Sequence, residues 1–276
     1  MPTLMQAFQM SSSSFSSIIN NLKPDLLIYD AFQPWAPKLA SSQGIPAVHF
    51  STSGATIMSF FHHNYTHGDA DFPFPAIYQR DHEEKDMKAR RESIKGKDAA
   101  KEGLELINVN FIWVVRFPAE NAVGIDESLP EGFLERVKER GKILQGWAPQ
   151  TEILAHSNIG GFASHCGWST VIESIYFAVP LIAMPLKLDQ PINARLVVDG
   201  GAAMEVLRDD DGLFMAEEVA KAIKTTILEK NDGECLRAKA MELTQKMKNE
   251  EEEAMNEAAD QLWRICTKNH DVVQSS

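Results

Sequence analysis

Residues 160–173 run from a predicted strand through a tight turn into a predicted helix, an arrangement that can bind a phosphate group. Gly167 has no Cβ, so the backbone there can approach a ligand closely. Thr170 and Glu173 have the spacing of a capping box, which predicts a helix start whose N–H groups and positive dipole end attract an anion. His165, on the same edge, is a candidate hydrogen-bond donor. The plain alternative is that Thr170 and Glu173 only cap a helix and that His165 is a buried structural histidine.

Aromatic and polar side chains follow two other predicted strands. Trp147-Ala-Pro-Gln150 comes directly after a strand that ends at Gln145, where a tryptophan can present its face to a planar base. Asp189 and Gln190 follow a strand over 181–185 and can bind sugar hydroxyls through carboxylate and amide groups. Taken alone, each motif has a simpler explanation: core packing for Trp147 and helix capping for Asp189 and Gln190.

Asp30 ends an apolar run that begins after Pro24 and has the composition of a buried parallel strand. In parallel sheets, ligands bind beyond the carboxyl ends of the strands. Asp30 and the stretch from Trp147 to Gln190 are therefore the candidate ligand-binding positions. The alternative for Asp30 is that it only caps the next helix.

The elements that must position these residues alternate between short apolar runs and helical segments. This alternation predicts an α/β fold with parallel strands covered by helices on both faces. We expect strands over 25–30, 47–50, 110–116, 142–145, 159–164 and 179–184. We expect helices over 1–19, 35–43, 130–140, 151–156, 169–177, 190–198 and from 216 onward, with an acidic exposed face at 250–253. Residues 62–82 are expected to be irregular, and 82–106 to form a charged, solvated helix or linker.

Composition excludes several classes of protein. The 276 residues are 44% hydrophobic and 24% charged, as in ordinary globular proteins. A net charge of −12 disfavours nucleic-acid binding. The three cysteines are widely spaced without a CxxC pair, which argues against a disulfide framework or a zinc site and predicts a protein of the reducing cytoplasm. No apolar run is long enough to span a bilayer, and the first residues lack the basic start of a secretory signal.

Taken together, the 44 residues from Trp147 to Gln190 resemble the signature box of plant family-1 UDP-glycosyltransferases. WAPQ at the start, HCGW in the middle, Glu173 and the closing DQ all fall at the family's spacing. DLLIYD with its QPWAP loop, NFIWVVRFP and NARLVVDGGAAMEV resemble the branch that adds glucose to acceptors already carrying a sugar. The resemblance implies a GT-B fold of two Rossmann-like parallel-sheet domains, both abbreviated here. The implied domains are a partial acceptor-binding domain at 1–88, a linker at 89–106, a donor-binding domain at 107–250 and a C-terminal helix and tail at 251–276.

The resemblance also implies roles for individual residues in binding UDP-glucose as the donor substrate. The uracil and ribose would be held by Trp147, Ala148, Gln150 and Glu173. The diphosphate would be contacted by His165, Gly167, Ser169 and Thr170, with Ser169 replacing the usual asparagine. The transferred sugar would face Trp168, Asp189, Gln190 and Thr52, and Gln190 favours glucose over galactose.

In this family a histidine removes the proton of the acceptor hydroxyl and an aspartate, here matched by Asp30, orients that histidine. The first histidine of this chain is His49, after Asp30, and we interpret His49, His62 and His63 as structural. The histidine-bearing loop and the first strand of the donor domain have no match, so sheet edges or apolar faces should be exposed. The implied activity is inverting transfer of glucose to a hydroxyl of a small plant metabolite or its glycoside. The alternative is a non-catalytic UDP-sugar-binding or unstable fragment, a splice or gene-model product.

The implied ligands are a UDP-sugar and a small-molecule acceptor. We expect no metal, no further cofactor and no nucleic acid, and the sequence identifies no protein partner.

Overall fold

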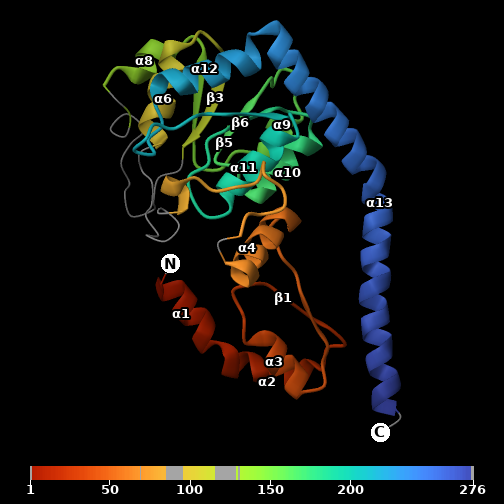
Figure 1. Ribbon diagram of the computed structural model, residues 1–276. Coiled ribbons are helices and arrows are strands. Elements are labelled where there is room, and N and C mark those ends of the chain that lie inside the picture. The colour runs from red at the N-terminus through yellow and green to blue at the C-terminus, as the bar shows by residue number, and fades with distance from the viewer. Residues whose placement is uncertain (1, 69, 85–95, 116–128, 130, 275–276) are drawn as a thin grey trace. The chain divides into compact units, whose positions relative to one another are not determined.

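The computed structural model describes residues 2–68, 70–84, 96–115, 129 and 131–274 (Figure 1). The chain divides into two compact units. The first comprises Met1–Gly54 and Met247–Ser276, and the second comprises Ala55–Lys246. Helix α13 (Lys230–Gln274) contributes residues to both units.

The first unit contains one small βαβ arrangement. Its elements up to Gly54 are α1 (Pro2–Met10), α2 (Ser12–Leu22), β1 (Leu27–Tyr29), α3 (Ala36–Ser42) and β2 (Ala47–His49). Strands β1 and β2 pair in parallel, with Leu27 opposite Ala47. Ile19 and Ala40, from α2 and α3, are buried in a small core with Leu27 and Ala47. Ile28 points to the other face and is 54% exposed, so this two-stranded sheet is covered on one face only.

The second unit is built around a three-stranded parallel sheet. Its strands, in the order β5-β6-β7, are β5 (Phe162–Ser164), β6 (Leu181–Ala183) and β7 (Ala203–Glu205). Successive side chains of a strand alternate between faces. Leu181 and Ala183 enter a core with residues of α10 (Trp168–Tyr176) and α11 (Gln190–Asp199). Ile182 enters a second core with residues of α6 (Gly96–Leu106) and α12 (Ala216–Ile227), so helices cover both faces.

The same unit holds a separate two-stranded sheet. Strands β3 (Phe111–Val115) and β4 (Gly141–Gln145) pair in parallel, and α8 (Phe133–Val137) packs on one face. Ile112 and Val114 face away from this core and are exposed. Two further helices, α4 (Ala55–His67) and α9 (Gln150–Leu154), complete the labelled elements of this unit.

The structure confirms most of the expected alternation and corrects four expectations. Helix α4 continues through His67, in a segment expected to be irregular, because Ile57 and Phe60 lie one turn apart and pack with Ile192 of α11. Strand β7 was not expected. Glu83 lies in the segment expected to be solvated, yet it is 5% exposed because it pairs with a buried arginine. The expectation that helices cover both faces of every sheet is wrong for the two-stranded sheets. The expectation that apolar faces are exposed is confirmed there.

The compact units divide at Gly54 and Met247, whereas the sequence placed a junction at 89–106. Residues 85–95, which include the start of that junction, lie outside the described residues. The domain boundaries at 88, 106 and 250 therefore stay predictions.

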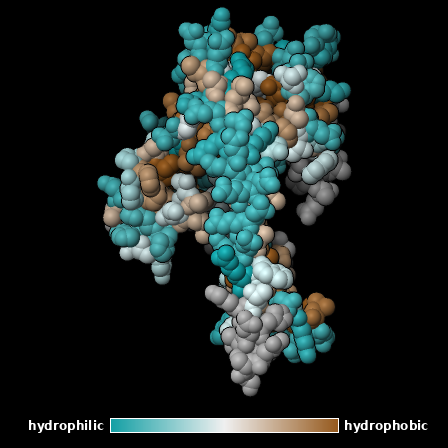
Figure 2. Space-filling model, turned by 90° about the vertical axis from the view of Figure 1, so that its right-hand side faces the viewer, coloured by the Kyte–Doolittle hydropathy of each residue, from teal (hydrophilic) through white to brown (hydrophobic). Residues whose placement is uncertain are grey.

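Helix α13 presents a polar surface along much of its length (Figure 2). Glu250, Glu251, Glu252 and Glu253 are all exposed, as expected. Among the described residues, no helix combines the length and apolar character needed to cross a membrane.

The crossing of α6 and α12 depends on a glycine. A Cβ placed on Gly103 would lie 2.7 Å from the Cβ of Val219 and 3.0 Å from the carbonyl oxygen of Ala216. Val219 is buried and β-branched, so it has little freedom to move aside. We expect Gly103→Ala to lower the free energy of unfolding by about 1 kcal/mol and at most about 2 kcal/mol, because the helix-propensity gain of about 1 kcal/mol offsets only part of an overpacking cost of roughly 1–3 kcal/mol. Urea denaturation measures this change, and a stabilised variant would contradict the close approach.

Candidate functional site

The turn between β5 and α10 places a histidine ring directly over a glycine. Cys166 adopts a left-handed conformation with φ of 64°, and its N–H donates to Ser164 Oγ at 3.1 Å. A Cβ on Gly167 would lie 2.9 Å from His165 Nε2. A larger residue at position 167 would therefore require the His165 ring to shift. Burial raises the pKa of the Cys166 thiol to about 12, so Cys166 is an uncharged part of the core.

The capping box expected at this turn is wrong. Helix α10 begins at Trp168, its N-cap residue is Gly167, and no side chain caps it. Thr170 is already the third residue of the helix, which is why it cannot act as the N-cap. The first N–H groups of α10 consequently have no side-chain cap and lie at the carboxyl end of β5, where an anion would be stabilised by them.

Glu173 contacts the preceding helix instead. Gln150 Nε2, at the start of α9, donates a hydrogen bond of 2.7 Å to Glu173 Oε2. Ala148 is buried, whereas Trp147 is 82% exposed beside them. The two side chains expected at the ribose therefore meet each other, next to the tryptophan expected at the base.

The loop after β6 is closed by its own glutamine. Gln190 Oε1 accepts hydrogen bonds of 2.9 Å from the N–H groups of both Leu186 and Lys187. Asp189 is the N-cap residue of α11, but its side chain does not cap the helix. The alternative of simple helix capping is therefore wrong for Asp189, while Gln190 has a structural role through its carbonyl oxygen.

Asn193 is a further polar residue of this region that the sequence motifs do not single out. Its Nδ2 donates to Asp189 Oδ2 at 2.9 Å and to the carbonyl oxygen of Cys166 at 3.1 Å. It is 1% exposed and thus ties the β5–α10 turn to the start of α11. The sequence does contain a signal for this role, since Asn193 is a polar residue one helical turn after Asp189 and lies between apolar neighbours.

His165 has a lowered pKa. Partial burial is the main cause; the negative charge of Asp189 opposes it, and the positive charge of Lys187 adds to it. His165 is exposed as a whole residue, so the alternative of a buried structural histidine is wrong.

This shift predicts a pH-dependent contribution to stability. The unfolded chain binds a proton at His165 near pH 6.5, more readily than the folded chain, so the free energy of unfolding falls as the pH falls below about 6.5. We expect His165→Gln to remove this contribution. Urea unfolding at about pH 7.5 and about pH 5.5 should show a smaller loss for the variant than for the unmodified chain. Equal losses would contradict the assignment.

Asp30 and Thr52 belong to the first unit, and the other site residues belong to the second. Asp30 Oδ1 accepts a hydrogen bond of 2.8 Å from the N–H of Phe32. Helix α3 has Trp35 as its N-cap residue and no side-chain cap. The alternative that Asp30 caps this helix is therefore wrong.

The histidines after Asp30 make local contacts. The ring of His49 lies 5.3 Å from that of Tyr29. His63 stacks on His67 at 4.5 Å, and its Nε2 lies 3.2 Å from the carbonyl oxygen of Ala70. His62 lies on the same helix, α4. The structural interpretation of His49, His62 and His63 stays a prediction.

Comparison with known proteins identifies the family. The sequence profile described as "UDP-glucoronosyl and UDP-glucosyl transferase" matches residues 101–259, more than half of the chain. The chain belongs to this family. This UDP-glycosyltransferase is 37% identical to β-D-glucosyl crocetin β-1,6-glucosyltransferase of Gardenia jasminoides, covering 97% of the chain and 81% of the relative. It is 36% identical to a mogroside IIIx synthase of Siraitia grosvenorii, covering 93% and 77% respectively.

The fold is that of GT-B UDP-glycosyltransferases, in abbreviated form. The Glycyrrhiza uralensis protein UGT73P12, complexed with glycyrrhetinic acid 3-O-monoglucuronide, superposes with a TM-score of 0.73 at 19% identity. The comparison covers 99% of this chain and 81% of that one. The alignment with the Gardenia relative has 361 positions against 276 residues here, so at least 85 positions (361 minus 276) are filled by the relative alone. Segments inside the aligned region are therefore shorter than in that relative.

Proposed function

We propose that this UDP-glycosyltransferase transfers glucose from UDP-glucose to a hydroxyl of a small plant metabolite or its glycoside, with inversion at the anomeric carbon. The similarity to the Gardenia enzyme carries the proposal, because that enzyme's name describes glucose transfer to an acceptor that already bears glucose. The mogroside IIIx synthase supports the same class of acceptor. We further propose that the protein acts in the cytoplasm.

The donor site is proposed to consist of the residues expected from the signature box. Trp147 stacks on uracil, the backbone of Ala148 binds its edge, and the Gln150–Glu173 pair exchanges its mutual hydrogen bond for bonds to the ribose hydroxyls. The diphosphate binds at the uncapped start of α10, where Ser169, Thr170 and His165 add donors. Trp168, Asp189 and Gln190 face the sugar. The packing of α10 and α11 around Asn193 supports this arrangement.

The chemical step requires a base. The acceptor hydroxyl loses its proton, its oxygen forms a bond to the anomeric carbon, and the bond from that carbon to the phosphate oxygen breaks as UDP leaves. Asp30 is proposed to orient the histidine that accepts the proton. Among the residues given, no histidine precedes His49.

A second candidate function is UDP-sugar binding without transfer. The exposed apolar side chains of Ile28 and Ile112 on two-stranded sheets favour reduced function. No metal is proposed in either case. The described residues contain no group of three or more histidine, cysteine, aspartate or glutamate side chains placed to hold one.

The test is a transfer assay beside a binding assay. The purified chain is incubated with UDP-glucose and a panel of glucosylated acceptors, including glucosyl crocetin, and mass spectrometry detects products larger by one hexose. Calorimetry with UDP and UDP-glucose measures donor binding. Products that disappear in Asp30→Asn support the first function. Binding without product supports the second, and a folded chain that binds neither nucleotide overturns both.

A further inference from the structure

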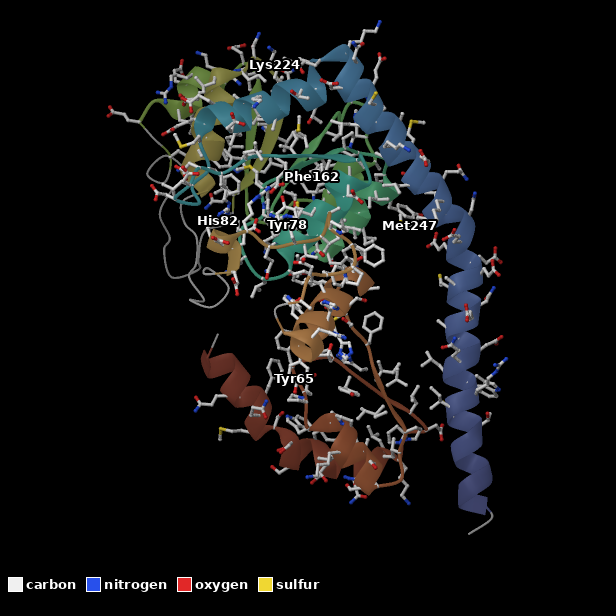
Figure 3. The ribbon with its side chains drawn as sticks, viewed as in Figure 1. Tyr65, Tyr78, His82, Phe162, Lys224 and Met247 are labelled. Carbon is white, nitrogen blue, oxygen red and sulfur yellow. The ribbon has the colours of Figure 1, made fainter. Side chains whose placement is uncertain are left out.

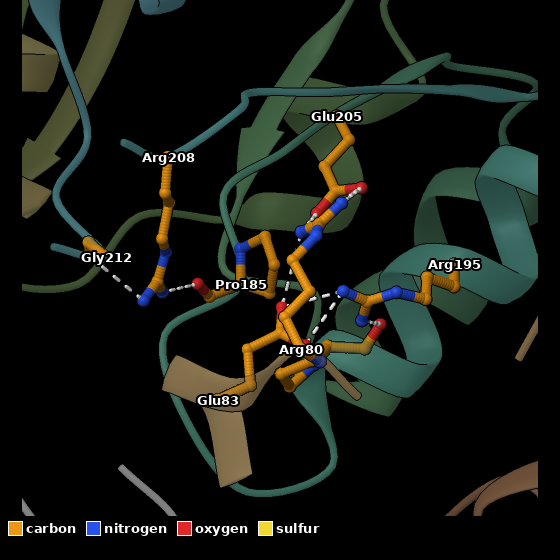
Figure 4. Close-up of polar contacts among 8 residues, drawn as sticks. Arg80, Glu83, Pro185, Arg195, Glu205, Arg208 and Gly212 are labelled. Atoms are coloured by element: carbon orange, nitrogen blue, oxygen red, sulfur yellow. Dashed lines mark hydrogen bonds and ion pairs between the residues drawn. The ribbon is translucent and has the colours of Figure 1, made fainter. Parts of the chain in front are cut away.

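A buried ion pair joins residues that are far apart in the sequence. Arg195 Nη2 lies 2.8 Å from each carboxylate oxygen of Glu83, and both residues are almost completely buried (Figure 4). Arg195 Nη1 donates to the carbonyl oxygen of Pro191 at 2.9 Å. Pro191 lies in the first turn of α11, so the pair holds the start of that helix.

A second pair extends the network to β7. Arg80 Nη1 and Nη2 bind the two oxygens of Glu205, the last residue of β7, at 2.6 and 3.0 Å. Glu205 raises the pKa of Arg80 further, so Arg80 keeps its charge. The N–H of Arg80 also donates to Glu83 Oε2 at 2.7 Å. The two ion pairs therefore share one segment of chain.

A third arginine holds the end of β6. Arg208 donates to the carbonyl oxygen of Pro185 and, at 3.3 Å, to that of Gly212 (Figure 4). Pro185 begins the loop that leads to Asp189 and Gln190, and Pro191 lies in the first turn of the helix that follows. The carbonyl groups of Pro185 and Pro191, on the two sides of this loop, thus both accept hydrogen bonds from arginine side chains, and Gln190 closes the loop between them.

Stability alone is a weak explanation for the Glu83–Arg195 pair. A buried ion pair costs desolvation, and apolar residues of similar volume are often equally stable or more so. Arg195 Nε is buried without a hydrogen-bond partner, which adds to that cost. The ring centroid of Tyr78, which is labelled in Figure 3, lies 4.4 Å from Arg195 Cζ, so the ring packs against the guanidinium. What this costly arrangement provides is a defined position for the start of α11.

We propose that Glu83 and Arg195 are positioning residues for the donor sugar. They hold the loop that carries Asp189 and Gln190, so that recognition of the sugar depends on a segment, residues 78–83, outside the signature box. The inference rests on the proposed function, in which Asp189 and Gln190 face the transferred sugar. It adds that the sugar-dependent part of the affinity, and not the UDP-dependent part, requires the ion pair.

The test compares calorimetric binding of UDP and of UDP-glucose to the full chain. The variant is Glu83→Gln/Arg195→Met, which removes both charges, keeps an acceptor for the N–H of Arg80 and approximately preserves volume. Glu242→Gln is the matched control, because Glu242 forms an exposed pair with Lys239 at 2.7 Å outside the site. We expect the double variant to bind UDP as the unmodified chain does and to lose about tenfold in affinity for UDP-glucose, the equivalent of one charge-assisted hydrogen bond.

The possible outcomes distinguish failure of the proposed function from failure of the positioning role of the ion pair. If the unmodified chain binds neither nucleotide, the proposed function fails and this inference fails with it. If the unmodified chain binds both and the double variant loses equal affinity for each, the ion pair is merely structural and the inference is wrong. Unchanged affinity for UDP-glucose also overturns it. Glu83→Gln alone, if folded, should reproduce the selective loss.

Discussion

Glu83→Gln is expected to lower the free energy of unfolding by about 3–5 kcal/mol, because it leaves the buried Arg195 guanidinium without its countercharge. The glutamine is nearly isosteric with glutamate, so lost packing contributes little. The excess positive charge cannot reach water, since Arg195 is 3% exposed. Urea denaturation followed by circular dichroism measures the change.

The double variant Glu83→Gln/Arg195→Met should recover most of this loss, because the remaining groups are neutral. The two substitutions are therefore expected to be strongly non-additive. Glu242→Gln, at an exposed pair, should change stability by roughly 0.5 kcal/mol or less. A loss for Glu83→Gln no larger than that of Glu242→Gln would show that the pair is not effectively buried in solution.

Trp147→Ala is expected to weaken UDP binding by about 5- to 150-fold, since stacking of a base on an aromatic side chain contributes about 1–3 kcal/mol. The free energy of unfolding should stay nearly unchanged, because Trp147 is 82% exposed. Calorimetric titration with UDP measures the affinity, and denaturation measures the stability.

Trp263→Ala provides the control for this prediction. Trp263 lies on α13, outside the signature box, and is 70% exposed. Its removal should leave UDP affinity unchanged. If Trp147→Ala and Trp263→Ala weaken UDP binding equally, or if neither weakens it, a uracil site at Trp147 is contradicted.

The elements predicted correctly are those whose side chains show a strong local pattern. Strand β3 has the unbroken apolar run FIWVV, and β4 and β6 also lie where short apolar runs predicted them. Strand β7 has only Ala203-Met-Glu205, without a β-branched residue, and exists because it pairs with β6. Helix α4 has no counterpart among the expected helices because its histidines and the prolines that follow suggest a loop, whereas the packing of Ile57 and Phe60 keeps it helical.

The candidate site also contains residues that a local sequence pattern predicts and residues that no local pattern predicts. The signature box is contiguous, so its residues and spacing are visible in the sequence, and the structure adds the contact between Gln150 and Glu173. Glu83 and Arg195 are 112 positions apart, and no local pattern connects them. In sequence, Glu83 begins a run of charged residues that is typical of a solvated helix. Only the tertiary fold shows that this carboxylate is buried.

The thiol of Cys166 is protonated and buried, so its chemical labelling can report local opening of the protein. Alkylating reagents attack thiolates, so in the folded protein they should modify Cys235, which is exposed, and Cys266, which is half-buried, while sparing Cys166. Cys166 lies in the turn that precedes α10, and its labelling requires that turn to open. The mass shift of the peptide containing Cys166, followed over time with and without nucleotide, would therefore measure how strongly a bound diphosphate closes this part of the molecule.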